Sequence, residues 1–279
     1  MRVSILFFLC LTGSIYGHCG ETFHLTPKET SALEQKVKNG DAAAASRLWT
    51  YHSMSSRNEK EAAKWLRTAA GLGHPEAARW LAYGIKEGRS SKEGFGLTPQ
   101  LAVEELLQKA SKMSGTAAND LGDNYREGYL KSRNRLEKAR NAFLLAASLD
   151  NTSSWVSLAA MLHRGEGGPI DQAGAYYYIG LTTQCIHARS VTGKELWELR
   201  RKIETHLSTG QMEDVWLRVD AYIKVKRRYS GSTLYPPALM GTGVPEKQWK
   251  EWRKETDDTE RQHRQLLRSK KQRQVATKR

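Results

Sequence analysis

The sequence predicts an all-α protein built from stacked helical hairpins. A pattern of Ala, Leu and Gly recurs three times, Pro is scarce in 279 residues, and no stretch alternates apolar and polar residues as a strand would. The first Ala of a small-residue pair stands at positions 69, 110 and 146, so the copies are 41 and 36 residues apart. Repeats of this length indicate helix pairs that bury their apolar faces on their neighbours.

The clearest copy runs from Ala62 to Gly88 and predicts two helices joined by a turn at Gly73. Small residues such as Ala69 allow the two helices to approach closely, and Gly suits a turn that needs a positive φ. In every copy a small residue stands four positions before a Leu, and a Gly that ends the second helix stands seven after it. These residues are Ala77, Leu81 and Gly88, then Ala117, Leu121 and Gly128, then Ser154, Leu158 and Gly165.

Partial copies flank this core. Upstream, Gly40-Asp41, Ala44 and Leu48 match a second helix, and its partner helix should begin at Thr26, with Pro27 at the first position and Glu29 completing a capping box. Downstream, residues 173–180 match a fourth first helix, followed by amphipathic segments at 194–207 and 211–226. We therefore expect a repeat solenoid over 22–190, a helical cap over 191–229, a linker over 230–244 and a basic helical tail over 245–279.

The pattern resembles the Sel1-like repeat, a relative of the tetratricopeptide repeat. Ala62-x-x-Trp65-x-x-x-Ala69-Ala70 and the following Gly73-His74 carry the resemblance. Later copies depart from it, since Val103 replaces Ala62 and the Gly-His pair is lost. The resemblance implies a right-handed superhelical solenoid that binds other proteins.

The N-terminus reads as a secretory signal peptide over residues 1–17. Met1-Arg2 precedes a short apolar run, Ile5–Leu11, and small residues follow near Gly17. The run is too short to cross a membrane, so we expect cleavage after Gly17 and a soluble periplasmic protein. Cys19 and Cys185 would remain, and in an oxidising compartment they either form one disulfide or stay as two thiols.

The chain carries a formal charge of +14, and Arg261–Arg279 contributes eight Lys or Arg residues without an acid. This tail is either a solvated extension or a contact for an acidic partner or an anionic membrane surface. The signal peptide argues against nucleic acid as a partner.

Nothing in the sequence indicates catalysis. His and Cys residues do not share metal-ligand spacing, and there is no Gly-x-Ser-x-Gly elbow or phosphate-binding Gly loop. We therefore expect no enzyme activity, cofactor or metal. His74 should be structural, and Asn151 should cap a helix although Asn151-Thr152-Ser153 matches a glycosylation motif.

Aromatic residues recur once per hairpin, and Arg residues recur on the second helices. Such pairs are typical interface anchors, although core packing or a solvated face explains many of them equally well. At least one of Tyr176–Tyr178 should be exposed, and Phe95 in the insertion 89–96 could enter a partner's cleft. We expect Ala at Trp155 or Tyr177 to weaken binding without unfolding. The candidate partner-binding residues are Trp65, Arg79, Tyr83, Phe95, Tyr125, Arg126, Trp155, Arg164 and Tyr177.

The layout of signal, degenerate repeats and helical cap resembles periplasmic immunity proteins that neutralise phospholipase D-type effectors of type VI secretion. This resemblance implies a protein that occludes the active site of a toxic phospholipase. Two other functions remain open: an adaptor that organises envelope machinery, and a secreted factor that engages host proteins.

Overall fold

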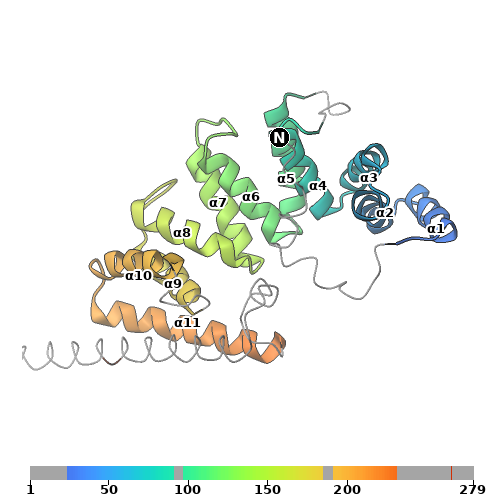
Figure 1. The fold of residues 1–279 in the computed structure, drawn as a ribbon. Coiled ribbons are helices and arrows are strands. Elements are labelled where there is room, and N and C mark those ends of the chain that lie inside the picture. Colours follow the sequence, from blue (N-terminus) through green and yellow to red (C-terminus); the bar gives the residue numbers. More distant parts are fainter. Residues whose placement is uncertain (1–23, 91–96, 185–190, 231–264, 266–279) are drawn as a thin grey trace, which may run out of the picture. The chain divides into compact units, whose positions relative to one another are not determined.

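The computed structural model describes residues 24–90, 97–184, 191–230 and 265. These residues form helices and no strands, so the all-α prediction is confirmed (Figure 1). The helices are α1 (Pro27–Lys38), α2 (Ala42–Met54), α3 (Glu59–Gly71), α4 (Pro75–Lys86), α5 (Pro99–Ser111), α6 (Gly115–Arg126), α7 (Arg135–Ser148), α8 (Thr152–Arg164), α9 (Gln172–Thr183), α10 (Val191–Glu204) and α11 (Thr209–Ser230).

The described residues fall into two compact units. One unit contains residues up to 154 together with 166–168, and the other contains 155–165 and the residues from 169 onward. Each unit is described by itself below. None of the described helices combines the length and apolar character needed to cross a membrane.

In the first unit, each helix from α1 to α7 packs on its neighbours along the chain, which is the predicted arrangement of successive hairpins. The small residues of the repeat lie at the contacts: Ala69 and Ala77 are fully buried, and Leu81 is almost so. Gly122 shows how close the helices come, because a Cβ placed there would lie 2.7 Å from the Phe143 ring. The small residues of the repeat therefore stand where neighbouring helices are in contact.

The first helices of three hairpins end in the same hydrogen-bonded turn. After α3, Gly73 donates to the Ala70 carbonyl and His74 donates to the Ala69 carbonyl, while Gly73 takes a φ of +89°. These two hydrogen bonds form a Schellman motif, and the positive φ of Gly73 is the backbone angle that the sequence predicted. Gly40 repeats it after α1 with a φ of +88°, and Asp150 repeats it after α7 with a φ of +59° although it is not a glycine.

The α5–α6 turn differs because it is one residue shorter. Ala69 precedes the cap residue of α4, His74, by five positions, whereas Ala110 precedes the cap residue of α6, Ser114, by four. No residue between α5 and α6 has a positive φ. The α5–α6 turn therefore joins its two helices without a residue in the left-handed conformation, unlike the turns after α1, α3 and α7.

The helices α2, α4, α6 and α8 each begin with a side-chain cap three residues before their first buried small residue. Asp41 and Asn151 accept hydrogen bonds from the backbone N–H groups of Ala44 and Ser154 at 2.9 Å and 3.0 Å. His74 Nδ1 and Ser114 Oγ accept from the N–H groups of Ala77 and Ala117, both at 3.3 Å. The structural interpretations of His74 and Asn151 are thereby confirmed.

The predicted start of α1 is also confirmed, since Thr26 and Glu29 form both halves of a capping box ahead of Pro27. The helix is nevertheless peripheral, because none of its residues is buried. Its stability rests on local hydrogen bonds and on partial packing against α2.

The second unit is organised around a buried arginine. The Arg200 guanidinium on α10 lies 4.5 Å from the Trp197 ring centre, 4.8 Å from that of Trp216 and 5.5 Å from that of Tyr176. Arg200 is fully buried and donates through Nε to Glu204 at 2.9 Å. Its partners come from α9, α10 and α11, so this one side chain joins three helices.

Tyr176 is the second centre of this cluster. Its hydroxyl accepts hydrogen bonds from Trp216 Nε1 at 2.9 Å and from Arg200 Nη2 at 3.4 Å. Burial raises the pKa of Tyr176 to about 12, against the opposing charge of Arg200. The hydroxyl is therefore neutral at physiological pH.

Several expectations concern residues outside the described ranges. They are the signal peptide over 1–17, Cys19, Cys185, Phe95 and most of the insertion around it, the linker over 230–244 beyond Ser230, and the tail over 245–279 apart from Gln265.

Candidate protein-binding face

Aromatic and charged side chains from three second helices meet on one surface of the first unit. We call this surface the second-helix face. It consists of Trp49 on α2, Arg79, Trp80 and Tyr83 on α4, and Asp120 and Asp123 on α6. The ring centres of Trp49 and Trp80 lie 6.5 Å apart, and those of Trp80 and Tyr83 lie 6.1 Å apart with their planes at 88°. The contacts thus continue from one helix to the next.

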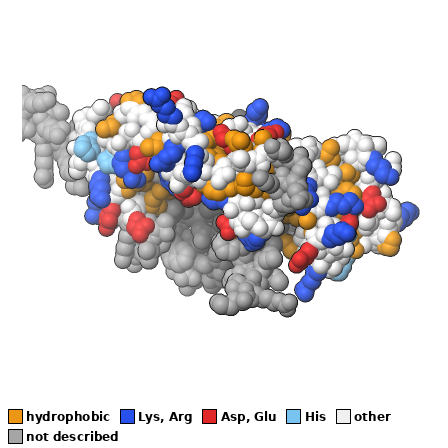
Figure 2. All heavy atoms as spheres, turned by 90° about the horizontal axis from the view of Figure 1, so that it is seen from above, with side chains coloured by type: hydrophobic (Ala, Val, Ile, Leu, Met, Phe, Trp, Pro, Cys, Tyr) orange, Lys and Arg blue, Asp and Glu red, His pale blue; other side chains and the backbone are white. Residues whose placement is uncertain are grey.

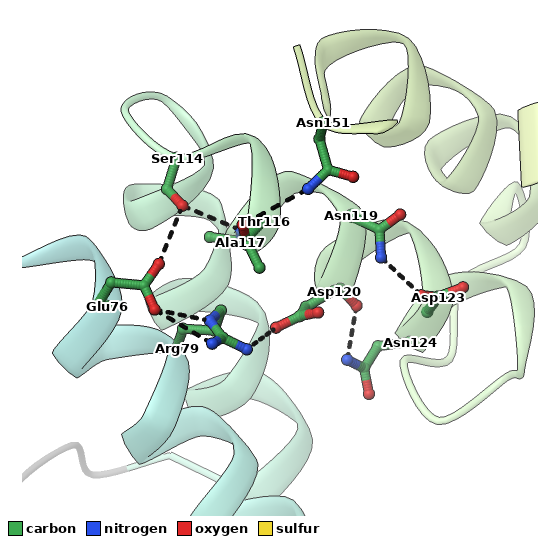
Figure 3. A network of polar contacts seen from close by, with 10 residues as sticks. All are labelled: Glu76, Arg79, Ser114, Thr116, Ala117, Asn119, Asp120, Asp123, Asn124 and Asn151. Atoms are coloured by element: carbon green, nitrogen blue, oxygen red, sulfur yellow. Dashed lines mark hydrogen bonds and ion pairs between the residues drawn. The ribbon is translucent and has the colours of Figure 1, made fainter. Parts of the chain in front are cut away.

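Arg79 connects α4 to α6 within this face, and Figure 3 shows it between Glu76 and Asp120. Its guanidinium forms ion pairs with Glu76 Oε2 at 3.1 Å and with Asp120 Oδ2 at 3.2 Å, and it lies 5.1 Å from the centre of the Trp80 ring. Its side chain is only 11% exposed. Arg79 is therefore fixed by α4 and α6 together, and it holds Trp80 in place.

The α6 side of the face is a chain of polar contacts, also seen in Figure 3. Asn119 donates to Asp123 at 2.9 Å, and Asn124 donates to the Asp120 backbone carbonyl at 2.7 Å. Burial raises the pKa of Asp120, and the charge of Arg79 opposes that shift. Asp123 pairs in turn with Arg126 at 2.7 Å. These bonds hold the carboxylates in fixed positions.

Tyr83 is the most exposed aromatic residue of the face, at 44%. The Arg89 guanidinium lies 4.9 Å from its ring centre. Nearby on α4, Lys86 lies 5.2 Å from the Tyr129 ring centre and pairs with Glu127 at 3.3 Å. A basic side chain therefore lies against each of the rings of Trp80, Tyr83 and Tyr129. On the side of the molecule drawn in Figure 2, basic and acidic side chains are interspersed with apolar ones.

Three of the nine predicted partner-binding residues belong to this region. Arg79 and Tyr83 lie within the face, and Arg126 borders it through its pair with Asp123. Arg126 also lies over the Phe143 ring at 5.3 Å. Its side chain is 35% exposed, so part of it remains available to a partner.

Three other predicted residues are corrected by their burial. Trp65, Tyr125 and Trp155 are 7%, 2% and 2% exposed, so their rings fill the core and offer almost no surface to a partner. The Tyr125 hydroxyl donates to Glu104 within the unit. Trp155 packs against Tyr222 with ring centres 6.0 Å apart. Because Trp155→Ala would empty a buried site, we now expect it to destabilise the second unit rather than to leave the fold intact.

The remaining predicted residues lie elsewhere. Arg164 is exposed at the end of α8, and Tyr177 is half-buried on α9 with Arg218 at 4.8 Å from its ring centre; both belong to the second unit. Tyr176 is buried and Tyr178 is half-buried, so none of the three consecutive tyrosines is fully exposed. Phe95 lies outside the described residues.

Sequence reasoning missed Trp49, Trp80, Asp120 and Asp123. A signal existed for two of them: Trp80 and Asp120 occupy the same place in successive copies, three positions after Ala77 and Ala117. In the part of the chain that the structure describes, no group of three or more His, Cys, Asp or Glu side chains is placed to hold a metal ion.

Comparison with known proteins gives a likeness of fold only. No protein-family model matches the chain, and no curated protein matches it. Among solved structures, a Sel1 repeat protein from Oxalobacter formigenes is 22% identical, with 54% of this chain and 61% of that chain covered and a TM-score of 0.46.

A second solved structure is c5321, a protective antigen of uropathogenic Escherichia coli with an SLR fold. It is 18% identical, with 73% of this chain and 51% of that chain covered and a TM-score of 0.46. The chain thus spans 61% and 51% of the two proteins. The hairpin architecture of residues 27–154 is established by the helix pairs and turns described above.

Proposed function

We propose that the protein binds another protein through the second-helix face, without enzymatic activity of its own. The observation that carries this proposal is the exposed Tyr83 ring beside Trp80, with Arg79 and Arg89 against the two rings. Tyr, Trp and Arg are the residues that contribute most to binding energy at protein interfaces.

The face is also held in place before any partner arrives. Arg79 is fixed by Glu76 and Asp120, and Trp80 is fixed between Arg79 and Trp49. Side chains that are already ordered lose less conformational entropy on binding, so more of the contact energy contributes to affinity. This favours a recognition surface over a solvated one.

The more specific function that we propose is that of a periplasmic immunity protein. It would block the active site of a phospholipase-type effector of type VI secretion. Its support is the signal-like N-terminus, the degenerate repeats and the lack of catalytic motifs in the sequence.

The test is a pull-down from periplasmic extract with the chain that begins after Gly17. Tyr83→Ala and Trp80→Ala should each reduce capture of the co-purifying protein at least about tenfold, as loss of an interface anchor does. Leu217→Ala is the matched control, because Leu217 is a large apolar residue that is 70% exposed in the second unit.

Each outcome has a distinct meaning. A captured phospholipase that wild-type protein inhibits and Tyr83→Ala does not inhibit would support the immunity function. Recovery of envelope machinery through the same face would support an adaptor instead. Capture that is equal for wild type, Tyr83→Ala and Trp80→Ala, with circular dichroism unchanged, would contradict the proposed face.

A further inference from the structure

The helix α11 carries apolar side chains on its outer side as well as on its inner one. On the inner side, Val219 and Ile223 are buried. On the outer side, Leu217 is 70% exposed and Val225 is 51% exposed, and Ala221 between them is exposed as well. These three residues are spaced four apart, so they form one stripe along the helix, which we call the α11 stripe. A single exposed Leu needs no explanation, whereas an aligned apolar stripe indicates a contact surface.

The tail that follows α11 in the sequence has a matching stripe. Twelve of the residues from Pro245 to Leu267 are charged, yet the positions 249, 252, 256, 259, 263 and 266 carry no Lys, Arg, Asp or Glu. This spacing of three and four residues keeps all six positions on one side of a helix. We call them the tail stripe, and their residues are Trp249, Trp252, Thr256, Thr259, His263 and Leu266. Gln265, the one tail residue that the structure describes, lies outside this stripe and is helical and exposed.

The length of chain between the two stripes permits a contact within one molecule. The helix α11 ends at Ser230 and the tail stripe begins at Trp249, so eighteen residues connect them. A connection of that length can reach up to about 60 Å, which is more than a return along α11 requires. It contains Pro236-Pro237 and Gly241, which are typical of turns. A short tether also keeps the tail at a local concentration of the order of mM, so that even a weak contact is populated.

The charges of the two segments are complementary when the segments lie antiparallel. In α11, residues 209–220 include three acidic residues and one basic residue, whereas 221–230 include four basic residues and no acidic one. In the tail, 245–260 include six acidic and four basic residues, whereas 261–279 include eight basic residues and no acidic one. An antiparallel pair therefore places each basic part beside a net acidic one, whereas a parallel pair would place like charges together. A connection that turns back after α11 also favours the antiparallel arrangement.

We infer that residues 245–267 dock as a helix on the α11 stripe of the same chain. The tail stripe covers Leu217, Ala221 and Val225, and the basic residues after 260 lie toward the amino-terminal end of α11. This surface belongs to the second unit, so the inference goes beyond the proposed function of the second-helix face and does not depend on it. It assigns the tail an intramolecular contact in place of a solvated extension.

Hydrogen exchange of the full chain, read by mass spectrometry of its peptides, tests this docking. The backbone amides of 249–266 should exchange at least about tenfold more slowly than those of an unstructured chain. The double variant Leu217→Asp with Val225→Asp should remove this protection, because it places two carboxylates in the apolar contact. Both side chains are largely exposed on α11 itself, so the amides around Val219 and Ile223 should stay protected and show that the helix remains folded.

The matched control is Leu101→Asp. Leu101 is another exposed leucine, at 49%, but it lies on α5 in the first unit, so its substitution should leave the exchange of the tail unchanged. Two results would overturn the inference. One is rapid exchange of 249–266 in the wild type, and the other is protection of the tail that the double variant on α11 leaves intact.

Dilution distinguishes the tail of the same chain from the tail of a second copy. Protection within one chain should persist over a roughly hundredfold dilution, whereas a contact between two chains weakens as the protein concentration falls. Loss of protection on dilution would therefore contradict the inference. Protection that requires added anionic vesicles would contradict it as well, and would assign the tail to a membrane surface.

Discussion

Arg79 Nη1 lies 3.2 Å from Asp120 Oδ2, and this ion pair joins α4 of one repeat to α6 of the next. The two residues are 41 positions apart, which is also the spacing of the first two repeat copies. The pair therefore acts as a polar contact between two successive hairpins, together with the more exposed Lys86–Glu127 pair. It also fixes Trp80, so one interaction supports both the stack and the candidate binding surface.

Removing one partner of this ion pair should be costly. Arg79→Met leaves Asp120 and Glu76 without their cation in a largely buried site, and we expect a loss of about 2 kcal/mol or more in the free energy of unfolding. Lys64→Met is the control, because the Lys64–Glu61 pair has 56% of the lysine side chain exposed and should cost less than about 1 kcal/mol. Urea unfolding measures both, and equal losses would show that the Arg79 pair is not a structural contact.

His74 should make stability depend on pH near neutrality. Its Nδ1 accepts from the Ala77 N–H at 3.3 Å, which requires that nitrogen to be unprotonated, and burial lowers the pKa of His74 against the opposing charge of Glu76. The unfolded chain therefore binds the proton more readily than the folded chain does. The contribution of His74 to stability is present above the unfolded pKa of about 6.5 and is lost as pH falls through the lower folded pKa.

His74→Asn tests this dependence, because Asn caps a helix without titrating. The free energy of unfolding of the wild type should fall from pH 7.5 to pH 5 more steeply than that of the variant. His24→Asn serves as an exposed control. A variant whose pH profile parallels that of the wild type would exclude His74 as the source.

Arg200 should tolerate no substitution. Arg200→Ala removes a fully buried side chain that contacts three aromatic rings, and it takes away the hydrogen bond that Arg200 donates to Glu204, so we expect a loss of about 3 kcal/mol or more in the free energy of unfolding. Arg200→Lys should be nearly as harmful, since an ammonium cannot stack as the planar guanidinium does.

The neighbouring Arg201→Ala is the control for this prediction, because Arg201 is exposed on the same helix. Thermal unfolding followed by tryptophan fluorescence reports the change directly through Trp197 and Trp216. If Arg201→Ala were as destabilising as Arg200→Ala, the cluster around Arg200 would not be a determinant of the second unit.

Two glycines should respond in opposite directions to the same substitution. Gly122→Ala brings a Cβ to 2.7 Å from the Phe143 ring, so α6 and α7 must separate, and we expect a loss of about 1–3 kcal/mol. Gly71→Ala meets no atom within 4 Å and should stabilise the helix by about 0.5 kcal/mol. Urea unfolding measures both changes in the free energy of unfolding. A stabilising Gly122→Ala would mean that α6 and α7 are not in close contact at Gly122.

The sequence predicted the hairpins well because their contacts are made by small residues at fixed spacing. Ala77, Leu81 and Gly73 have the burial and backbone angle that their positions required. The turn after α7 was harder to predict, since Asp150 adopts the left-handed conformation that a glycine usually marks. The short α5–α6 turn is visible in the sequence, because four positions rather than five separate Ala110 from Ser114. The sequence did not show that this turn has no residue with a positive φ.

Binding residues were less predictable because composition does not reveal exposure. Trp65 and Trp80 are the same residue type on adjacent helices, yet Trp65 is buried and Trp80 is part of a surface. Arg200 gave no signal at all, since an Arg on an amphipathic helix normally lies in solvent. Its burial depends on Tyr176 and Trp216, which are distant in sequence and meet it only in the folded unit.

The helix α1, which buries no residue, has a consequence for how the first unit opens. In a linear array each repeat is held by the adjacent repeats alone, so the array unfolds progressively from its least supported end rather than all at once. The peptide bonds of α1 should exchange their hydrogens with solvent first, and a protease should find its earliest cleavage sites there, while α6 and α7 remain closed. The first unit should therefore unfold in a fixed order, beginning at its amino-terminal hairpin and continuing toward α7.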